Sequence, residues 1–361
     1  MKLFPQLDKQ YSKEQLRYME AQHLAHGIAF APITFQVSRL MVKFGIFNLL
    51  NETKNGLTIN EIADKINLSE YAVKVLIEAS LTIGTVLYKD EKFVLSKAGW
   101  ILLTDPLVNV NMTFNHSVAY LGMYDMEKAL LNGKPEGLKV FGEWKTIYEG
   151  LSQLPPDVRK SWFDFDHFYS DNSFDEALGH VFSYKPRTLL DVGGNTGRWA
   201  LRCVDYDEQV RVTVMDLPRQ IEMMRSQTAG HKGAERIDGY AADLLNEDEP
   251  FPKGFDAIWM SQFLDCFSEK EVTSICRRTA AAMDADSRLF VMETLWDRQP
   301  NATAAYCLTQ LSLYFTVMAN GNSKMYNSDD MFRCIEAGGL KVEKVFDGLR
   351  SGHSILVCKK A

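Results

Sequence analysis

The stretch with the clearest chemical character spans residues 187–198 and reads RTLLDVGGNTGR. Its first part, residues 188–192, is a short apolar run typical of a buried strand, and the glycine-rich turn 193–197 follows directly. The amphipathic segment from Arg198 to Val204 then predicts a helix. A strand, a glycine turn and a helix N-terminus together form a pocket of the nucleotide-binding type at the carboxyl end of a buried strand.

The details of this turn narrow the class of ligand. Gly193, Gly194 and Gly197 let backbone N–H groups approach a ligand that side chains would hold away. A dinucleotide fingerprint would place a further glycine where Asn195 stands. Asp191 lies in the strand, two residues before the turn, where a carboxylate repels a pyrophosphate but suits a cationic or zwitterionic ligand. The amino-acid end of S-adenosylmethionine is such a ligand.

Two further acids follow the next expected strands. Asp216 comes directly after the strand 211–215, within MDLP, where a carboxylate can accept hydrogen bonds from both hydroxyls of a ribose. Asp243 follows the strand after that, in the sequence AAD, and is placed to face an adenine amine. A cap or a turn explains any one of these acids but not the set. Three acids at the ends of three successive strands favour an S-adenosylmethionine site over an NAD site.

Composition excludes several other classes of protein. The 361 residues are enough for two domains, and with 46% hydrophobic and 24% charged residues the chain is typical of a globular protein. The net charge of −7 argues against non-specific nucleic-acid binding, which depends on clustered Lys and Arg. No signal-peptide core and no uncharged apolar run near 18 residues is present, so we expect a cytoplasmic protein with no membrane partner.

The six cysteines are scattered through the second half of the chain, without a C-x-x-C pair or metal-site spacing. We therefore expect free thiols in a reducing compartment and no bound metal. The positions are Cys203, Cys266, Cys276, Cys307, Cys334 and Cys358.

The N-terminal part predicts helices with more apolar surface than a small lobe can cover. Residues 12–50 have helical spacing of apolar residues, with a capping box at Ser12 and Gln15 and an interruption at Pro32. A second apolar stripe spans residues 35–50. Such a stripe suits a homodimer interface, although an intrachain core would also account for it.

Residues 58–95 predict a winged helix-turn-helix. One helix opens at Thr58, a second spans residues 71–83, and VLYKD and KFVLS form the wing. DNA binding would place residues 69–80 in the major groove. That segment offers one Lys and two Glu but no Arg, Asn or Gln, whereas base and phosphate contacts need donors and cations. A structural role is the better interpretation, and we expect no nucleic-acid partner.

From residue 105 to 183 the pattern is helical and aromatic-rich. The segment WFDFDHFYSDNSF, residues 162–174, carries more aromatic side chains than a connector needs. It suits either one wall of an aromatic substrate pocket or a core between domains. The residues expected to line such a pocket are Trp162, Phe165, Phe168, Tyr169 and, further along the chain, Met318.

From residue 184 onward, strands and helices alternate, as in a doubly wound parallel sheet. The last two strands, joined by DGLRSG, are expected to close as an antiparallel hairpin. Helices are expected to begin near Gly197, Pro218, Ser268 and Ala302, and at Ser328, where Ser-Asp-Asp resembles an N-cap. The expected strands are 188–192, 211–215, 235–239, 255–261, 287–293, 342–346 and 353–357.

These motifs resemble a known family, the S-adenosylmethionine-dependent O-methyltransferases of the plant caffeate, acetylserotonin and bacterial polyketide type. The resemblance covers nearly the whole chain and rests on FGIFNLL, LTINEIADKI, LLDVGGNTG, MDLP, AADLL, PKGFDAIWMSQFLDCFS and LFVMETL. It implies a Rossmann-like class I methyltransferase domain with seven strands at 184–361. A helical and winged-helix dimerisation domain would occupy residues 1–105, and a helical connector lining the substrate pocket residues 106–183.

The resemblance also implies a set of cofactor contacts, a small-molecule acceptor and an intertwined homodimer formed through the N-terminal domain. Ser261 stands near the place where many relatives carry a Lys. S-adenosylmethionine would be bound, with S-adenosylhomocysteine as product. The expected cofactor-binding residues are Asp191, Gly193, Gly194, Gly197, Asp216, Leu217, Asp243, Leu244 and Ser261.

The catalytic positions depart from the family pattern. Relatives carry a His in a stretch like L-H-D-W-S, which takes the proton from the substrate hydroxyl, and Asp265 stands at that place here. One of the two glutamates that flank this His is present as Glu293, whereas Met325 stands near the position of the other. The expected catalytic residues are therefore Asp265 and Glu293, on a small aromatic or polyketide-like hydroxyl.

Several alternatives stay open at this point. Burial and a neighbouring Glu293 would raise the pKa of Asp265 towards neutrality, so that it can act as a base. The acceptor can instead be acidic or an amine that needs no base, and Asp265 can simply cap the helix that starts near Ser268. A relative with non-methylating chemistry, or a catalytically inactive regulatory dimer that binds the cofactor, would also fit the missing His.

Overall fold

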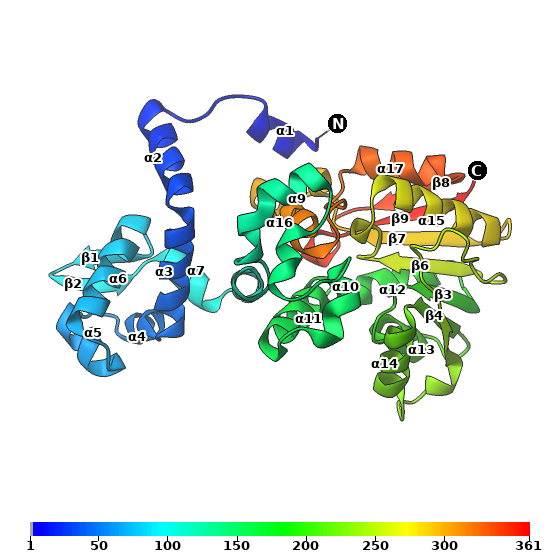
Figure 1. Ribbon diagram of the computed structural model, residues 1–361, viewed down its shortest axis with the longest axis horizontal. Coiled ribbons are helices and arrows are strands. Elements are labelled where there is room, and N and C mark those ends of the chain that lie inside the picture. Colours follow the sequence, from blue (N-terminus) through cyan, green and yellow to red (C-terminus); the bar gives the residue numbers. More distant parts are fainter. Residues whose placement is uncertain (1–2) are drawn as a thin grey trace. The chain divides into compact units, whose positions relative to one another are not determined.

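The computed structural model describes residues 3–361 (Figure 1). Its contacts divide the chain into two compact units. One unit comprises Glu14–His116, and the other unites the N-terminal segment up to Lys13 with Ser117–Ala361. We call them the N-terminal unit and the catalytic unit and describe each by itself.

The N-terminal unit confirms the predicted winged helix. Thr58 caps α5 by accepting a hydrogen bond from the N–H of Glu61, and the Glu61 carboxylate accepts one from the N–H of Thr58. Ser69 caps α6. Strands β1 and β2 pair as the antiparallel wing. The elements are α2 (Tyr18–Ala29), α3 (Ala31–Lys43), α4 (Ile46–Glu52), α5 (Ile59–Ile66), α6 (Glu70–Ile83), β1 (Val86–Lys89), β2 (Lys92–Leu95), α7 (Lys97–Thr104) and α8 (Pro106–Phe114).

Two local predictions in this unit need correction. Ser12 does not open a helix but ends α1 (Pro5–Tyr11), and the next helix begins at Tyr18, where Glu20 bonds back to the N–H of Arg17. The second apolar stripe is also not one helix, because Gly45, with a φ of 75°, breaks it between α3 and α4.

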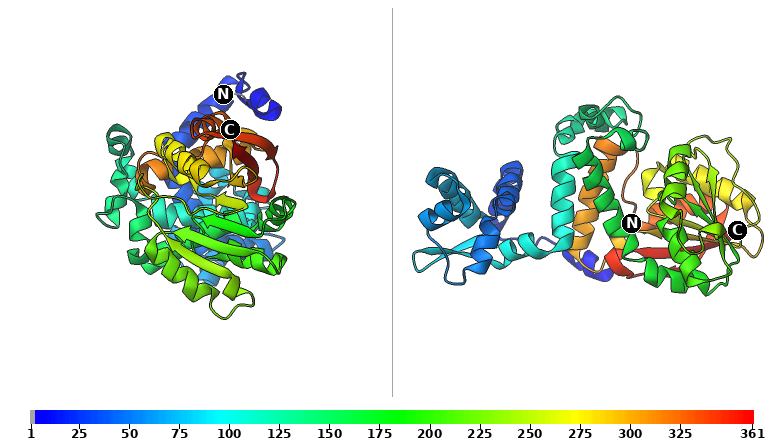
Figure 2. Two further views of the ribbon diagram at one scale, coloured as in Figure 1. Left: turned by 90° about the vertical axis from the view of Figure 1, so that its right-hand side faces the viewer. Right: turned by 90° about the horizontal axis from the view of Figure 1, so that it is seen from below.

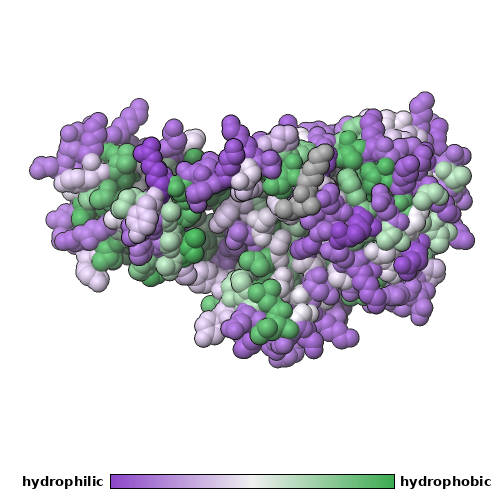
Figure 3. All heavy atoms as spheres, turned by 90° about the horizontal axis from the view of Figure 1, so that it is seen from above, coloured by the Kyte–Doolittle hydropathy of each residue, from purple (hydrophilic) through white to green (hydrophobic). Residues whose placement is uncertain are grey.

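Helix α2 stands out because none of its residues is buried. Several of its large apolar side chains are exposed, including Tyr18, Met19, Leu24 and Ile28. Apolar surface is visible over the N-terminal unit on the left of Figure 3. A 12-residue helix without buried side chains is marginal in water, because most helical stability in proteins comes from packing.

The catalytic unit is built on a seven-stranded sheet, in the order β5-β4-β3-β6-β7-β9-β8. Strands β3 to β7 run parallel, whereas β9 pairs antiparallel with both β7 and β8, which confirms the predicted hairpin. The strands are β3 (Thr188–Val192), β4 (Arg211–Asp216), β5 (Ile237–Ala241), β6 (Ala257–Ser261), β7 (Arg288–Glu293), β8 (Leu340–Phe346) and β9 (Ser354–Lys360).

Helices cover both faces of this sheet, as the turned views in Figure 2 show. Alternate residues of β3 enter opposite cores: Leu190 packs with α15 and α17, and Leu189 packs with α12, α13 and α14. Asn327, rather than Ser328, caps α17 by accepting from the N–H of Asp330. These helices are α12 (Phe174–Phe182), α13 (Arg198–Tyr206), α14 (Pro218–Thr228), α15 (Glu269–Ala282) and α17 (Ser328–Ala337).

Further helices precede the sheet and lie between β7 and β8. In the same unit, α11 contacts α16 through a hydrogen bond from the indole of Trp162 to the hydroxyl of Tyr314, 2.8 Å long. The α-helices among them are α9 (Met126–Asn132), α10 (Ile147–Gly150), α11 (Pro156–Asp171) and α16 (Ala302–Tyr314). The short turns are η1 (Asn115–Ala119), η2 (Gly122–Asp125), η3 (Glu136–Val140), η4 (Leu151–Gln153), η5 (Ala234–Arg236), η6 (Leu264–Cys266), η7 (Trp296–Arg298), η8 (Phe315–Ala319) and η9 (Arg350–Gly352).

Within residues 3–361, no single helix is both long and apolar enough to cross a membrane. Helices α3 and α4 pass that test of length and composition only as a pair, with a 59° bend between them.

Candidate active site

The glycine turn forms at the carboxyl end of β3, as the sequence predicts. Gly193 has a φ of 74°, and its N–H donates to the carbonyl of Met215. A Cβ on Gly193 would lie 2.3 Å from the ring of Phe263, so only glycine fits between the turn and this side chain. Gly197 has a φ of 79° and leads into α13. The turn is therefore closely packed, with its backbone accessible only because side chains are absent.

Asp216 holds the turn in place. Its Oδ2 accepts from the backbone N–H of Asn195 at 2.8 Å, and its Oδ1 accepts from the N–H of Leu217 at 2.7 Å. Each carboxylate oxygen can accept a second hydrogen bond, so capacity for two ribose hydroxyls remains. Burial raises the pKa of Asp216 to about 6, against the two N–H groups that lower it.

Asp191 differs from Asp216 in its surroundings. Its side chain is 2% exposed, and its Oδ2 lies where a Cβ on Gly194 would come within 2.5 Å. Burial, with a smaller effect of the Asp216 charge, raises the pKa of Asp191 to about 8. The charged role towards the ligand that the sequence argument assigned to Asp191 stays a prediction, and burial works against the charged form of this carboxyl.

The other predicted cofactor residues lie at the ends of β5 and β6. Asp243 is exposed and accepts from the N–H of Leu245 at 3.0 Å, whereas Leu244 is buried. Ser261 is the last residue of β6, and its buried hydroxyl has no hydrogen-bond partner among residues 3–361. Direct contact of these three residues with a ligand stays a prediction.

The two predicted catalytic acids are brought together by neighbouring strands. Glu293 ends β7, which pairs with β6, and its Oε1 accepts from the N–H groups of Phe263 and Leu264 at 3.0 and 2.8 Å. Asp265 follows in the same turn and is 4% exposed. Burial raises the pKa of Asp265 to about 6. The pKa of Glu293 is raised further, by burial and by the charge of Asp265.

Asp265 does not cap the helix that follows it. Ser268 caps α15 through a capping box with Glu271, in which the N–H of Ser268 donates to the Glu271 carboxylate at 2.8 Å. Met325, at the place of the second family glutamate, is buried, with its sulfur 3.6 Å from the hydroxyl of Thr294. The structure therefore leaves Asp265 and Glu293 as the carboxyl groups at this place.

The aromatic residues of α11 are only partly brought together with this site. Trp162, Phe165 and Phe168 keep some exposed surface, and the ring centroids of Phe165 and Tyr169 lie 4.8 Å apart. Met318 is fully buried, and a Cβ on Gly122 would lie 2.0 Å from its sulfur. The expectation that Met318 lines a pocket needs correction, because its side chain has no surface left for a ligand.

Sequence reasoning missed three polar residues near the catalytic acids. The thiol of Cys266 contacts Asp265 Oδ1 at 3.5 Å and hydrogen-bonds with Tyr148, whose ring packs edge-on against Trp162. Asp166 on α11 is influenced by the charge of Asp265. The sequence offered one signal, the alternation of Asp with aromatic residues in WFDFDHFY, but no way to tell which acid faces inward.

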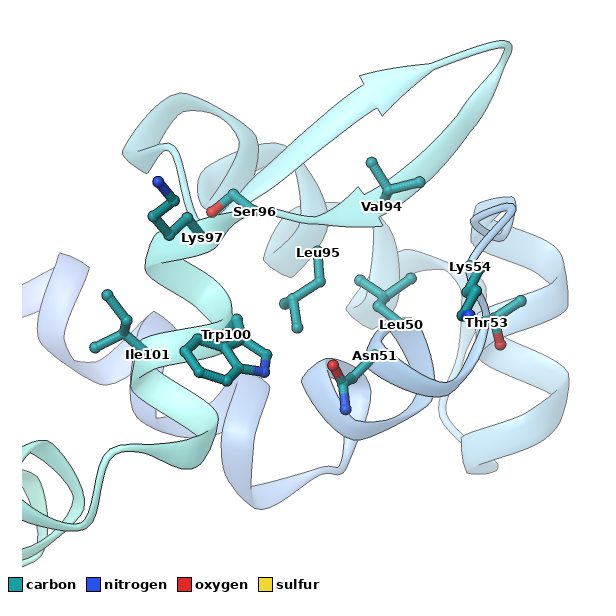
Figure 4. Close-up of a pocket in the computed structure, with 10 residues that line it drawn as sticks. All are labelled: Leu50, Asn51, Thr53, Lys54, Val94, Leu95, Ser96, Lys97, Trp100 and Ile101. Carbon is teal, nitrogen blue, oxygen red and sulfur yellow. The ribbon is translucent and has the colours of Figure 1, made fainter.

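A separate hollow of about 640 Å³ lies in the N-terminal unit (Figure 4). Trp100 and Ile101 come from α7, Leu50 and Asn51 from α4, and its ten lining residues include no carboxylate, His or Cys. Its ionisable side chains are the exposed Lys54 and Lys97, so it offers no carboxylate or imidazole base for proton transfer. Its lining is Leu50, Asn51, Thr53, Lys54, Val94, Leu95, Ser96, Lys97, Trp100 and Ile101.

The residues around the glycine turn fit S-adenosylmethionine better than a dinucleotide. The turn lacks the glycine that pyrophosphate approach requires and carries Asn195 there, with a φ of 50°. Asp216, Asp265 and Glu293 all lie at the carboxyl end of the sheet, so a second anion would be repelled and a sulfonium or ammonium favoured. Among the described residues, no group of three or more His, Cys, Asp or Glu is arranged to hold a metal ion.

Comparison with known proteins agrees with this geometry. Residues 22–93 match the model of a Dimerisation2-like domain, and residues 173–333 match that of an O-methyltransferase domain. The mitomycin biosynthesis 6-O-methyltransferase of Streptomyces lavendulae is 24% identical over 311 residues, which is 84% of each chain. The chain therefore carries a Dimerisation2-like domain followed by an O-methyltransferase domain.

Solved structures share the fold. The mitomycin 7-O-methyltransferase MmcR superposes with a TM-score of 0.70 at 22% identity, over 94% of this chain and 98% of its own. The O-methyltransferase NcsB1 from neocarzinostatin biosynthesis, crystallised with S-adenosylmethionine and 2-hydroxy-5-methyl naphthoic acid, superposes with a TM-score of 0.67 at 16% identity, over 91% and 96%. Both likenesses confirm the predicted class I methyltransferase fold.

Proposed function

We propose that this protein transfers a methyl group from S-adenosylmethionine to the hydroxyl of a small aromatic or polyketide-like acceptor, with Asp265 as the proton acceptor. The observation that carries this proposal is the buried carboxyl pair of Asp265 and Glu293 at the ends of β6 and β7. Named relatives act in mitomycin biosynthesis, and one solved neighbour holds a hydroxynaphthoic acid.

When bound, S-adenosylmethionine supplies an electrophilic methyl group on a sulfonium. Asp216 would hold its ribose and the turn 193–197 its amino-acid end. The protein then has two tasks at the acceptor, to hold its oxygen in line and to remove its proton. A phenol has a pKa near 10, and its phenolate is the better nucleophile, so a nearby base speeds the reaction.

Asp265 suits the task of base because of the pKa that its surroundings give it. With a pKa of about 6 it is mostly ionised at neutral pH, yet it binds a proton more readily than an exposed carboxylate. Glu293, whose pKa is raised by burial and by the charge of Asp265, holds the turn through its Oε1. Asp265 therefore takes the proton in this proposal, and Glu293 holds the backbone of the turn in position.

The same proposal includes a homodimer formed mainly by residues 1–105, in the cytoplasm. The support for the dimer is helix α2, which buries none of its own residues, together with the match of residues 22–93 to a dimerisation-type domain. An identical helix of a second copy would cover the exposed side chains of Tyr18, Met19 and Ile28.

Label transfer tests the activity. Wild-type protein is incubated with methyl-labelled S-adenosylmethionine and a panel of hydroxynaphthoates, simple phenols and aliphatic alcohols, and the labelled atom is located by mass spectrometry. We expect label on the oxygen of an aromatic acceptor. Cofactor binding without label on any acceptor would instead support the alternative of an inactive regulatory dimer, and label on carbon or nitrogen would contradict O-methylation.

A further inference from the structure

Asp166 is a carboxyl group next to the glycine turn that the proposed reaction does not use. It lies on α11 one helical turn after Trp162, so both face the same side of that helix. Its side chain keeps 30% of its surface accessible although protein surrounds it closely enough to raise its pKa to about 7. Asp166 is therefore a partly exposed carboxyl whose closely packed surroundings disfavour its charge.

No protein cation neutralises Asp166. Among the described residues, its one partner within ion-pair distance is the ring of His167, whose Nδ1 lies 3.9 Å from Asp166 Oδ2. Burial lowers the pKa of that imidazole, so the ring is neutral at pH 7. Arg198 lies near enough to act on the charge of Asp166 but is ion-paired with Asp171. Asp166 is therefore a carboxylate that still has room for a cation.

Asn195 connects Asp166 to the ribose position. The Asn195 amide oxygen accepts from Gln220 Nε2 at 2.8 Å, which leaves its NH₂ group to donate to Asp166. The backbone N–H of the same residue donates to Asp216 Oδ2 at 2.8 Å. Asn195 thus lies between two carboxyl groups, with its backbone N–H bound to Asp216 and its side-chain amide bound to Asp166.

We infer that Asp166 binds the α-ammonium of the methionine moiety of S-adenosylmethionine. This inference rests on the proposed function, because it assigns a further contact to the same cofactor. In that ligand only a few bonds separate the ribose from the amino-acid end, so a ribose at Asp216 brings the ammonium towards Asn195 and Asp166. The ammonium has three N–H donors for a carboxylate, whereas the sulfonium has none.

Two truncated forms of the ligand separate this role from a structural one. S-adenosylhomocysteine carries the amino-acid end, and 5′-methylthioadenosine lacks it but keeps the adenosine. Calorimetry with full-length protein should show that Asp166→Asn weakens S-adenosylhomocysteine about 10- to 100-fold, the usual range for a hydrogen bond to a charged group. Binding of 5′-methylthioadenosine should stay within about twofold of wild type, because the substitution leaves the protein contacts to the adenosine end unchanged.

The matched control is Asp164→Asn, on the same helix. Asp164 is exposed and ion-paired with Lys160, so its loss should change neither affinity. Asp166→Asn should also melt no lower than wild type at pH 7, because it replaces a carboxyl whose folded-state pKa is raised and which therefore destabilises the fold above its unfolded pKa.

A proton balance gives a second readout. The groups that act on Asp166 are the charges of Asp171, Asp265 and Arg198 and the side-chain amide of Asn195. With a pKa of about 7, the Asp166 carboxyl is partly protonated at pH 7. Pairing with an ammonium ionises it, so S-adenosylhomocysteine binding should release protons, seen as a buffer-dependent enthalpy that Asp166→Asn reduces.

Three outcomes would overturn the assignment. Unchanged S-adenosylhomocysteine affinity in Asp166→Asn would show that the carboxyl does not touch the amino-acid end, and an equal loss for both ligands would show a structural role. Wild-type protein that binds neither ligand would overturn the proposed function together with this inference.

Discussion

Glu293 holds the backbone immediately before Asp265, and the two carboxyl groups form an electrostatically coupled pair. Glu293 Oε1 accepts from the N–H groups of Phe263 and Leu264, and its Oε2 is buried without a partner among residues 3–361. Burial and then the charge of Asp265 raise the pKa of Glu293, so the ionisation of one carboxyl disfavours that of the other. In the proposed reaction, Asp265 takes the place of the missing His, and Glu293 holds the backbone next to it.

The hydrogen bonds of Glu293 predict that two substitutions at this position differ in their effect on stability. Glu293→Gln keeps an oxygen for both N–H groups and should fold normally. Glu293→Ala leaves two buried N–H groups unpaired and should lower the free energy of unfolding by on the order of 2–5 kcal/mol. Urea denaturation of both variants checks this. Equal stability of the alanine variant and wild type would show that these hydrogen bonds do not hold the turn.

The raised pKa of Glu293 also predicts how stability depends on pH. Burial and the charge of Asp265 raise its folded-state pKa above the ordinary value of 4.5, so its contribution to stability falls as pH rises above that value. Glu293→Gln removes this dependence. Its stability relative to wild type should therefore increase as the pH rises above 4.5, and a constant difference would argue against a raised pKa of Glu293.

Asp216→Ala should weaken adenosine-containing ligands as a class. The change removes the acceptor for two ribose hydroxyls and releases the N–H groups of Asn195 and Leu217. We expect a loss of about 2–3 kcal/mol in binding free energy for S-adenosylhomocysteine and for 5′-methylthioadenosine alike. Titration calorimetry gives both values, and undiminished binding would remove Asp216 from the ribose contact.

The exposed helix α2 predicts the assembly state. Light scattering of wild-type protein at micromolar concentration should give twice the chain mass of 41.1 kDa. Ile28→Asp places a charge on the exposed apolar side of α2 and should shift the mass towards a monomer. Leu245→Asp, at an exposed apolar position in the catalytic unit, should leave the dimer intact. A wild-type monomer would refute the dimer.

The centre of the sheet was predictable from the sequence because β3, β6 and β7 are largely apolar runs, with β3 followed by Gly193 and β7 ending in Glu293. Pairing of β6 with β7 then placed Asp265 near Glu293, since the carboxyl ends of neighbouring parallel strands meet. The break at Gly45 was not predicted, because FGIFNLL continues the apolar spacing on both sides of it. Local pattern did not distinguish one bent helix from two.

The details of the site depended on burial and contacts that residue order does not encode. Asp164 and Asp166 read alike in the sequence, yet one pairs with Lys160 at the surface and the other faces the glycine turn. Met318 looked available to a ligand but packs against Gly122. Asp191 lies inside β3 and is 2% exposed, whereas Asp216 ends β4 and accepts from two backbone N–H groups, a difference that residue order does not show.

The pKa of Asp265 predicts the pH dependence of methyl transfer. A base works only when ionised, so the single-turnover rate should fall as pH drops through about 6, approaching tenfold per pH unit well below it. The rate should be nearly level from pH 7 to pH 8.5. A profile that is flat between pH 5 and pH 8 would mean that no group of this pKa takes the proton.

The most direct test of the account is the single-turnover rate of Asp265→Asn with labelled S-adenosylmethionine and a phenolic acceptor that the wild type methylates. Asparagine keeps the shape of the side chain, and Ser268 rather than Asp265 caps α15, so the fold and cofactor affinity should be preserved. We predict a rate lower by about 10²–10⁴-fold, together with loss of the pH dependence near 6. A variant that methylates at the wild-type rate from pH 6 to pH 9 would contradict the account and leave alignment alone to carry the chemistry.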